Sequence, residues 1–282
     1  MKQELSPKKK KIYLILLIAL LIFIIIGLDQ RLLVRYYALD TEKITNPVRI
    51  VLITDLHSCR YGKNQEILLN AVEEQHPDII ALAGDIFDDQ LPDENTETVL
   101  AEISETYPCY YVTGNHEGWC TKEKFLKNMN FLKEHDIAIL SGTMEQIEIN
   151  SQKLNLCGVD DPDCEAYSEN PDNTEKQLQT VNALCQNGNY SILLSHRPEL
   201  FPEYQNLDFD LVLCGHAHGG QWRIPFLLNG LYAPNQGLFP KFAGGLYQEN
   251  NITMIVSRGL ARESTKVPRF YDRPELVTID LQ

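Results

Sequence analysis

The stretch VRIVLITDLH, residues 48–57, joins an apolar β-branched run to a polar pair, Asp55 and His57. Such a run predicts a buried strand. Farther along the chain, other apolar runs end in short polar clusters of the same kind. These clusters are Gly84-Asp85, Gly114-Asn115-His116-Glu117, Ser195-His196-Arg197-Pro198 and Gly215-His216-Ala217-His218. Because strand ends deliver side chains to one rim of a sheet, where ligands bind in α/β folds, the clusters predict one shared site.

The segments around these clusters alternate between strand and helix patterns. The first half of the body has expected strands over 48–54, 78–83 and 109–113, and expected helices over 65–74, 96–105 and 122–135. This alternation is typical of βαβ units with a parallel sheet. The second half has an expected hairpin over 145–158 and further strands over 190–194, 211–214, 253–257 and 275–279. We therefore predict an α/β fold of two packed mixed β-sheets flanked by helices, an αββα sandwich.

The polar clusters contain the donors that a pair of metal ions needs. Asp55 and His57 are two residues apart, so they point the same way if the backbone stays extended, and they can share one cation. Asp85 has two carboxylate oxygens and can bridge two cations about 3.5–4 Å apart. The amide and imidazole donors that remain are Asn115, His196, His216 and His218. This mixture favours Mn²⁺, Fe or Zn²⁺ over Ca²⁺ or Mg²⁺.

The ordered motifs resemble those of the calcineurin-like metallophosphoesterase superfamily over about residues 48–218. The following Gly219-Gly220-Gln221 and the tail motif Val256-Ser257-Arg258-Gly259 are similar to its membrane-associated bacterial branch. The resemblance implies two metal sites that share one ligand: Asp55, His57, Asp85 and His218 in the first, and Asp85, Asn115, His196 and His216 in the second. It also implies that a hydroxide bridging the metals attacks phosphorus. His116 would then be a catalytic residue beside the leaving group rather than a ligand.

Each motif also has a plainer interpretation when it is taken alone. Asp55 or Asp85 could serve only the turn after its strand, and Gly219-Gly220 could be a flexible loop. We name Arg197, Gly219 and Gly220 as candidate substrate-binding residues, although a surface or ion-pair role is the simpler interpretation of Arg197. The acidic segment 160–163 is interpreted as a solvated loop rather than as a cation site.

The charge of the chain bears on its partners. The formal net charge is −14, and residues 1–11 contribute five Lys and one Glu, a net +4, so the rest of the chain carries −18. A body so acidic lacks the basic surface that releases counterions from nucleic acid. This disfavours a nuclease acting on long polymers, while a buried metal pair still attracts a small phosphoester or a lipid headgroup.

The first residues of the chain predict a membrane anchor. The basic segment 1–11 precedes an uninterrupted apolar run over residues 12–28, which reaches about 25 Å as a helix and so spans a bilayer at the short end of the range. A cleaved signal peptide and a buried core helix are the alternatives. Because lysines concentrate before the run, we place the N-terminus in the cytoplasm and the body outside, in a single-pass membrane protein. Residues 29–46 are then expected to be a juxtamembrane stalk, and 47–282 the metallophosphoesterase domain.

The chain has seven cysteines, an odd number, so at least one of them has no disulfide partner within the chain. Free buried thiols are the simplest interpretation. A disulfide between Cys157 and Cys164 or between Cys109 and Cys120 is the alternative, and it would suit an oxidising exterior.

These observations predict a membrane-anchored phosphoesterase that uses two metal ions. The expected reaction is hydrolysis of a phosphodiester or pyrophosphate bond, with a lipid or cell-envelope precursor as a candidate substrate. A phosphomonoesterase is the alternative enzyme, and a non-catalytic metal-binding scaffold is the alternative of another class. The sequence indicates no protein partner.

Overall fold

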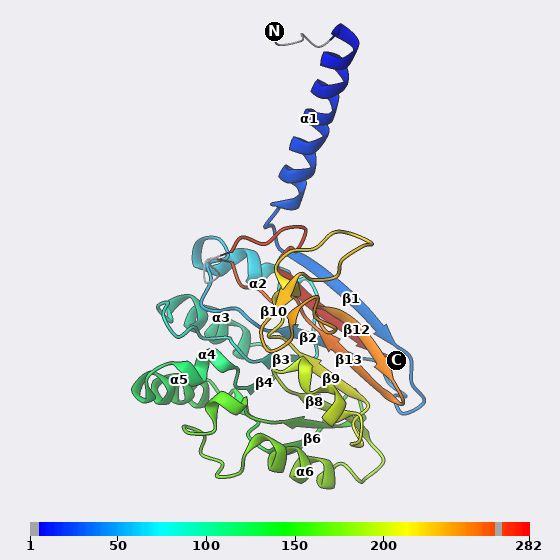
Figure 1. The fold of residues 1–282 in the computed structure, drawn as a ribbon. Helices are drawn as coiled ribbons and strands as arrows, with labels where there is room; N and C mark the ends of the chain where they lie inside the picture. The colour runs from blue at the N-terminus through cyan, green and yellow to red at the C-terminus, as the bar shows by residue number, and fades with distance from the viewer. Residues whose placement is uncertain (1–5, 263–266) are drawn as a thin grey trace.

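The computed structural model describes residues 6–262 and 267–282, so the first five residues of the predicted basic segment 1–11 lie outside the described part. Two six-stranded mixed sheets pack against each other, and helices cover their outer faces (Figure 1). The predicted fold class, an α/β sandwich of two mixed sheets between helices, is confirmed.

The first sheet has the strand order β1-β14-β2-β3-β4-β5, and β14 is antiparallel to β2 whereas the other neighbours are parallel. The strands are β1 Leu33–Leu39, β2 Val48–Ile53, β3 Ile79–Ala83, β4 Cys109–Val112, β5 Ala138–Ile139 and β14 Glu275–Leu281. The crossover helices are α2 Glu66–Glu73, α3 Glu94–Ser104 and α5 Lys122–Glu134. Thr121 caps α5, because its side chain accepts a hydrogen bond from the Lys124 amide.

The second sheet has the strand order β12-β13-β9-β8-β7-β6, with antiparallel pairs at both edges and parallel pairs between. The strands are β6 Thr143–Ile149, β7 Gln152–Gly158, β8 Tyr190–Leu194, β9 Leu211–Cys214, β12 Gly245–Glu249 and β13 Ile252–Val256. The helices on this side are α6 Thr174–Leu184 and α7 Phe201–Tyr204. The predicted hairpin is confirmed: β6 and β7 meet at Asn150 and Ser151, which both have positive φ as a tight turn requires.

The apolar runs are continuous because the central strands are buried on both faces. In β2, Ile50 and Leu52 belong to the core between the sheets, together with residues of β8 and β9 such as Leu194 and Leu213. Val51 in the same strand points the other way and packs under the helices with residues such as Leu68. Alternate residues of one strand therefore fill two different cores, which fixes the register of the sheet.

Short elements complete the structure around the loops. They are α4 Asn115–Trp119, the two-residue strands β10 Tyr232–Ala233 and β11 Gly237–Leu238, and the 3₁₀ turns η1 Lys63–Gln65, η2 Pro162–Cys164, η3 Pro198–Leu200 and η4 His218–Gly220. All seven cysteines are free and buried, as the sequence predicts. Cys157 lies with its sulfur 3.1 Å from that of Cys185, so the structure pairs neither of the couples that the sequence suggested.

The expected stalk over residues 29–46 is wrong in its central part. Leu33–Leu39 forms β1, which runs parallel to β14 from Leu33 opposite Glu275 to Leu39 opposite Leu281. The segment is only half-buried, because it is an edge strand with one side open to solvent. Its sequence, LVRYYAL, mixes charged and apolar residues, so it carries a weaker strand pattern than the central strands.

The N-terminal helix α1, Pro7–Gly27, projects from the body (Figure 1). It begins among the lysines and includes nearly all of the apolar run, whose side chains are exposed. By length and composition the helix could cross a membrane, and a signal sequence at this position would meet the same criteria.

Candidate metal centre

The predicted ligands follow strand ends that face one rim of the sandwich. Asp55 and His57 follow β2, Asp85 follows β3, and His216 and His218 follow β9. All five have positive φ, between 45° and 67°, a conformation that non-glycine residues adopt at a cost of about 1–3 kcal/mol and that concentrates at functional sites. The extended backbone that we expected between Asp55 and His57 is therefore wrong. Their side chains converge because the chain turns sharply after β2.

Asp55 also joins the rims of the two sheets. The backbone amide of His216, from the second sheet, donates to Asp55 Oδ1 at 3.0 Å, and the Thr54 hydroxyl donates to Oδ2 at 3.0 Å. Asp55 and Thr54 are both buried. The bond from His216 fixes the loop after β9 against the loop after β2, so donors from both sheets face the same space.

Two groups of donor atoms share Asp85. Asp55, His57, Asp85 and His218 form the first, and Asp85, His196 and His216 form the second, with the ligand atoms of each group within 4.8 Å of one another. Asp85 Oδ2 lies 3.5 Å from His57 Nε2 and 3.2 Å from His196 Nε2. One carboxylate oxygen therefore faces both groups, which is where a ligand that bridges two ions has to lie.

Several buried donor atoms around this space have no hydrogen-bond partner among the described residues: His57 Nε2, Asp85 Oδ2, Asn115 Oδ1, His196 Nε2 and His218 Nδ1. Leaving such atoms unpaired is costly unless something else binds them. The opposite ring nitrogens are occupied, since His57 Nδ1 lies 3.2 Å from Asp88 and His196 Nδ1 donates to the Ala83 carbonyl at 2.8 Å. These bonds turn the free Nε2 lone pairs inward. The residues present therefore fit a pair of divalent cations.

The electrostatics of the centre agree with this fit. Burial and the nearby charge of His196 lower the pKa of His216 well below its usual range, and burial with His57 does the same to His218. Neutral imidazole is the form that binds a metal ion. Although burial opposes it, Asp85 raises the pKa of His196 to about 10. The centre therefore attracts positive charge, which a cation would supply.

Glu117 supports the two loops that carry Asp85 and Asn115. It is 1% exposed, and its Oε2 accepts from the amides of Asp85 at 3.0 Å and Gly114 at 2.8 Å. Its Oε1 accepts from the amides of the two residues after Asp85 at 2.9 and 3.1 Å. Burial and the charge of Asp85 raise the pKa of Glu117 to about 7. Glu117 therefore holds both loops in place.

His116 lies beside the two donor groups and is partly exposed. Its Nδ1 is 2.6 Å from Asp89 Oδ1 and 3.5 Å from Asp88 Oδ2. Its ring packs edge-on against His57, with centroids 4.2 Å apart, and against Trp119 at 4.7 Å. The bond to Asp89 occupies Nδ1 and orients the ring, so Nε2 is the atom at which His116 can exchange a proton.

Arg197 is bound to protein groups rather than open to solvent. Its Nε and Nη2 donate to the two oxygens of Asp161 at 2.5 and 2.8 Å, and its Nη1 donates to Asn235 Oδ1 at 2.9 Å. Asn235 Oδ1 also lies 2.9 Å from His216 Nε2. The ion pair therefore braces a predicted ligand. The solvated loop that we expected over 160–163 is wrong for Asp160 and Asp161, which are 3% and 2% exposed and are buried with their donors, whereas Asp163 is exposed.

Gly219 and Gly220 are buried and have positive φ. A Cβ at Gly219 would overlap the carboxylate of Asp272, and one at Gly220 would overlap Gly230. These contacts explain by packing why small residues occupy both positions. The prediction that they bind substrate stays a prediction.

Three residues of the centre were missed by sequence reasoning. Asp88 and Asp89 orient His57 and His116, and the acidic pair shortly after Gly84-Asp85 was the signal that could have revealed them. Asn235 lies far along the chain from its partners Arg197 and His216, and no local pattern marks it.

Comparisons with known proteins place these observations in context. Residues 48–220 match the sequence model named calcineurin-like phosphoesterase. The metallophosphoesterase YkoQ of Bacillus subtilis is 28% identical over 234 residues, which cover 81% of this chain and 82% of that protein. The phosphodiesterase YaeI of Escherichia coli is 28% identical over 240 residues, which cover 83% of this chain and 82% of that protein.

Among solved structures, the NAD nucleotidase NadN of Haemophilus influenzae matches with a TM-score of 0.50 at 18% sequence identity. The match covers 77% of this chain and 46% of that one, so the chain spans less than half the length of that structure. At this level of identity the similarity shows a shared fold alone.

Proposed function

The chain belongs to the calcineurin-like phosphoesterase family and is a metal-dependent phosphoester hydrolase, and from this premise we propose that it is a membrane-anchored enzyme that hydrolyses a phosphodiester or pyrophosphate bond with two divalent cations. One observation carries the proposal of two cations. Asp85 Oδ2 faces His57 Nε2 and His196 Nε2 and forms a hydrogen bond with neither.

The proposed ligands are those that the sequence indicated: Asp55, His57, Asp85 and His218 for one cation, and Asp85, Asn115, His196 and His216 for the other. The mixed oxygen and imidazole donors suit Mn²⁺, Fe or Zn²⁺. When bound, two such cations supply a water of lowered pKa and stabilise the charge that develops on the phosphoryl oxygens. The hydrogen bonds that His57 Nδ1 donates to Asp88 and that His196 Nδ1 donates to the Ala83 carbonyl hold both rings in the tautomer that this binding needs.

We propose that His116 gives a proton to the leaving oxygen. Asp89 holds its Nδ1 at 2.6 Å, so the proton available for transfer is the one on Nε2. Asp88 and the edge of the His57 ring limit the rotation of the His116 ring. The residue is therefore oriented by the same acidic pair that orients a predicted ligand.

A diester or pyrophosphate substrate is favoured over a monoester because a relative of 28% identity, YaeI, is named as a phosphodiesterase. A lipid headgroup or cell-envelope precursor fits an enzyme fixed at a membrane. Arg197, which braces His216, would contact substrate only by exchanging part of its bond to Asp161. We therefore propose that the main role of Arg197 is to position His216 and that binding of substrate phosphate is a minor role.

We propose that α1 is a retained anchor with its lysine-rich end in the cytoplasm and the body outside. The exposed apolar surface of α1 and the lysines at its start support this orientation. Protease added to intact cells should then degrade the body. Protection of the body in intact cells, with degradation after lysis, would reverse the orientation.

The function is tested with the full chain in detergent, bis(p-nitrophenyl) phosphate and its monoester as substrates, and added Mn²⁺. Chelator-sensitive release of nitrophenol, faster from the diester, is the expected result. Faster turnover of the monoester would make the protein a phosphomonoesterase. Two bound metal ions with no turnover of either compound or of a pyrophosphate would favour the scaffold. An oligonucleotide incubated with the Mn²⁺-loaded protein should stay intact, given the acidic body.

A further inference from the structure

Residues 222–239, here called the apolar loop, expose an unusual amount of hydrophobic surface. Phe226 is fully exposed, Leu227 is 84% exposed, and Leu238 and Phe239 are 66% and 67% exposed. Ile224 and Leu228 exchange backbone hydrogen bonds of 3.1 and 2.8 Å, which close a tight tip with Phe226 and Leu227 between them. Contiguous apolar side chains on the surface of an acidic body mark a place where something binds.

The apolar loop is fastened to α1 through residues 268–271. The Trp222 indole donates to the Pro268 carbonyl at 2.9 Å, and the Trp222 ring lies 5.6 Å from that of Phe270. Phe270 in turn packs on Phe23 of α1, again with centroids 5.6 Å apart. Tyr271 donates from its hydroxyl to the Phe23 carbonyl at 3.0 Å. An unbroken chain of aromatic contacts therefore joins the apolar loop to the last turns of the apolar helix.

This connection places the apolar loop beside the end of α1 at which a bilayer would meet the body. Figure 1 shows the yellow loop reaching out at the same end of the body as the base of α1. Tryptophan and tyrosine favour the membrane interface, because one end of each ring system is apolar and the other is polar. Just beyond α1, Arg31 and Arg273 both pair with Asp29, at 2.8 and 3.6 Å.

We infer that the apolar loop docks on the lipid surface of the bilayer that α1 crosses, with Phe226 and Leu227 entering the interface. A lipid surface is favoured over a protein partner because the loop continues directly from the membrane helix through Trp222, Phe270 and Phe23. The inference rests on the proposed anchoring by α1, which it extends from a tether to a second contact with the membrane.

Docking would bring the metal centre to the membrane surface. Trp222 comes four residues after the predicted ligand His218, and Asn235 of the apolar loop lies 2.9 Å from His216 Nε2 and accepts from Arg197. The segment that touches lipid thus also holds the centre. The substrate class that follows is a phosphoester carried on a lipid headgroup, which reaches the centre without leaving the bilayer surface.

The test places a single tryptophan at the tip of the apolar loop. The chain has two tryptophans, Trp119 and Trp222, so the full-length variant Trp119→Phe/Trp222→Phe/Phe226→Trp carries its only indole at position 226. It is reconstituted in phosphatidylcholine–phosphatidylglycerol vesicles whose acyl chains are brominated near the glycerol. The expected result is loss of most of the tryptophan fluorescence. The matched control puts the indole at the exposed Leu184 of α6, at the far end of the body from α1 (Figure 1), and should keep its fluorescence.

Each outcome decides a separate point. Vesicle flotation at alkaline pH reports whether α1 is inserted, and turnover of the soluble diester by the same preparation reports the metal centre. A protein that floats but keeps its fluorescence at position 226 would overturn the docking and leave the anchor in place. A protein that fails to float would overturn both. Thermal midpoints equal to that of the wild type confirm that neither indole variant is misfolded.

Discussion

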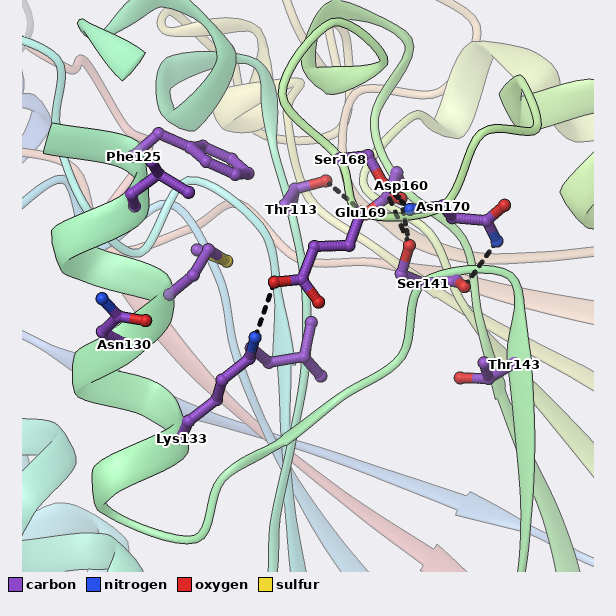
Figure 2. Close-up of a pocket in the computed structure, with 13 residues that line it drawn as sticks. Thr113, Phe125, Asn130, Lys133, Ser141, Thr143, Asp160, Ser168, Glu169 and Asn170 are labelled. Carbon is purple, nitrogen blue, oxygen red and sulfur yellow. Dashed lines mark hydrogen bonds and ion pairs between the residues drawn. The ribbon is translucent and has the colours of Figure 1, made fainter. Parts of the chain in front are cut away.

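Asp85 and Asp160 are both buried aspartates, 0% and 3% exposed, but their carboxylates have opposite surroundings. Asp160 lines a pocket of about 340 Å³ beside α5 (Figure 2). Its oxygens accept hydrogen bonds from four side chains: Ser141, Ser168, Gln177 and Thr113. Asp85 accepts one, from the His116 amide at 2.8 Å, and its Oδ2 accepts none among the described residues.

The difference shows that burial alone does not mark a metal site. A buried carboxylate whose oxygens are filled by hydroxyl and amide donors needs no cation and contributes to stability. One with a free oxygen between imidazoles needs a positive charge there. The backbone agrees, because Asp85 has a φ of 52° and Asp160 has no such strain. Four changes to the protein test this contrast.

The largest effect is expected for Asp85→Asn. An amide at this position removes the negative charge and offers an NH₂ where two cations have to be bridged. Turnover of bis(p-nitrophenyl) phosphate should fall to the level seen with chelator, and bound metal, measured by elemental analysis, should fall with it. Asp160→Asn is the matched control and should keep both. Full activity of Asp85→Asn would contradict the two-metal proposal.

Metal removal should destabilise the protein. Ions that bind the folded chain contribute about 2.7 kcal/mol when their free concentration is about 100 times the Kd. Adding chelator should therefore lower the thermal midpoint of the wild type and of Asp160→Asn alike. The midpoint of Asp85→Asn should respond much less. A decrease of equal size in all three proteins would show that the stabilising metal ions bind without Asp85.

Asp88→Asn should weaken metal binding by about 10–100-fold, the usual range for a residue that orients a metal-binding histidine. The reason is that Asp88 Oδ2 lies 3.2 Å from His57 Nδ1 and fixes the ring. The measurement is titration of the metal-free protein with Mn²⁺. Asp89→Asn is the control, because Asp89 contacts His116 and not His57. It should lower kcat and leave metal affinity unchanged.

Asp160→Asn should cost about 1–3 kcal/mol of unfolding free energy, since an amide nitrogen would face donors that now have an acceptor. Denaturant unfolding measures this loss, and metal content should not change. Glu169→Gln is the control. Glu169 lines the same pocket, is 78% exposed and pairs only with Lys133 among the described residues (Figure 2), so its loss should be small. An unaltered denaturation midpoint for Asp160→Asn would contradict the claim that the hydrogen bonds of Asp160 stabilise the fold.

Much of the fold follows from the sequence because the central strands are buried on both faces. Runs such as Val48–Ile53 and Ile79–Ala83 are almost entirely apolar, and each ends where a polar cluster begins. Strand β1 was missed for the opposite reason. It is an edge strand of mixed polarity whose partner, β14, lies at the other end of the described chain, so no local pattern indicates the pairing.

The candidate site divides in the same way. The motifs predict which residues come together at the metal centre, because residue type and position after a strand are local properties of the sequence. The sequence could not show how Asp55 and His57 turn toward Asp85, since that depends on positive φ values. Nor could it show that Asp161 and Asn235 bind Arg197, because both contacts join distant segments. The contact of Cys157 with Cys185 was missed for that reason too.

The position of β14 between β1 and β2 has a consequence for the order of folding. β1 and β2 are neighbours in the sequence but not in the sheet, so the edges by which they pair with β14 stay open until β14 is synthesised. During synthesis, β1 therefore stays without its partner strand until the segment 275–281 has been made. A chain cut short before β14 would leave β1 without its partner and β2 with an open edge, and such unpaired edges invite aggregation and proteolysis. A truncated chain that lacks β14 therefore cannot complete the first sheet.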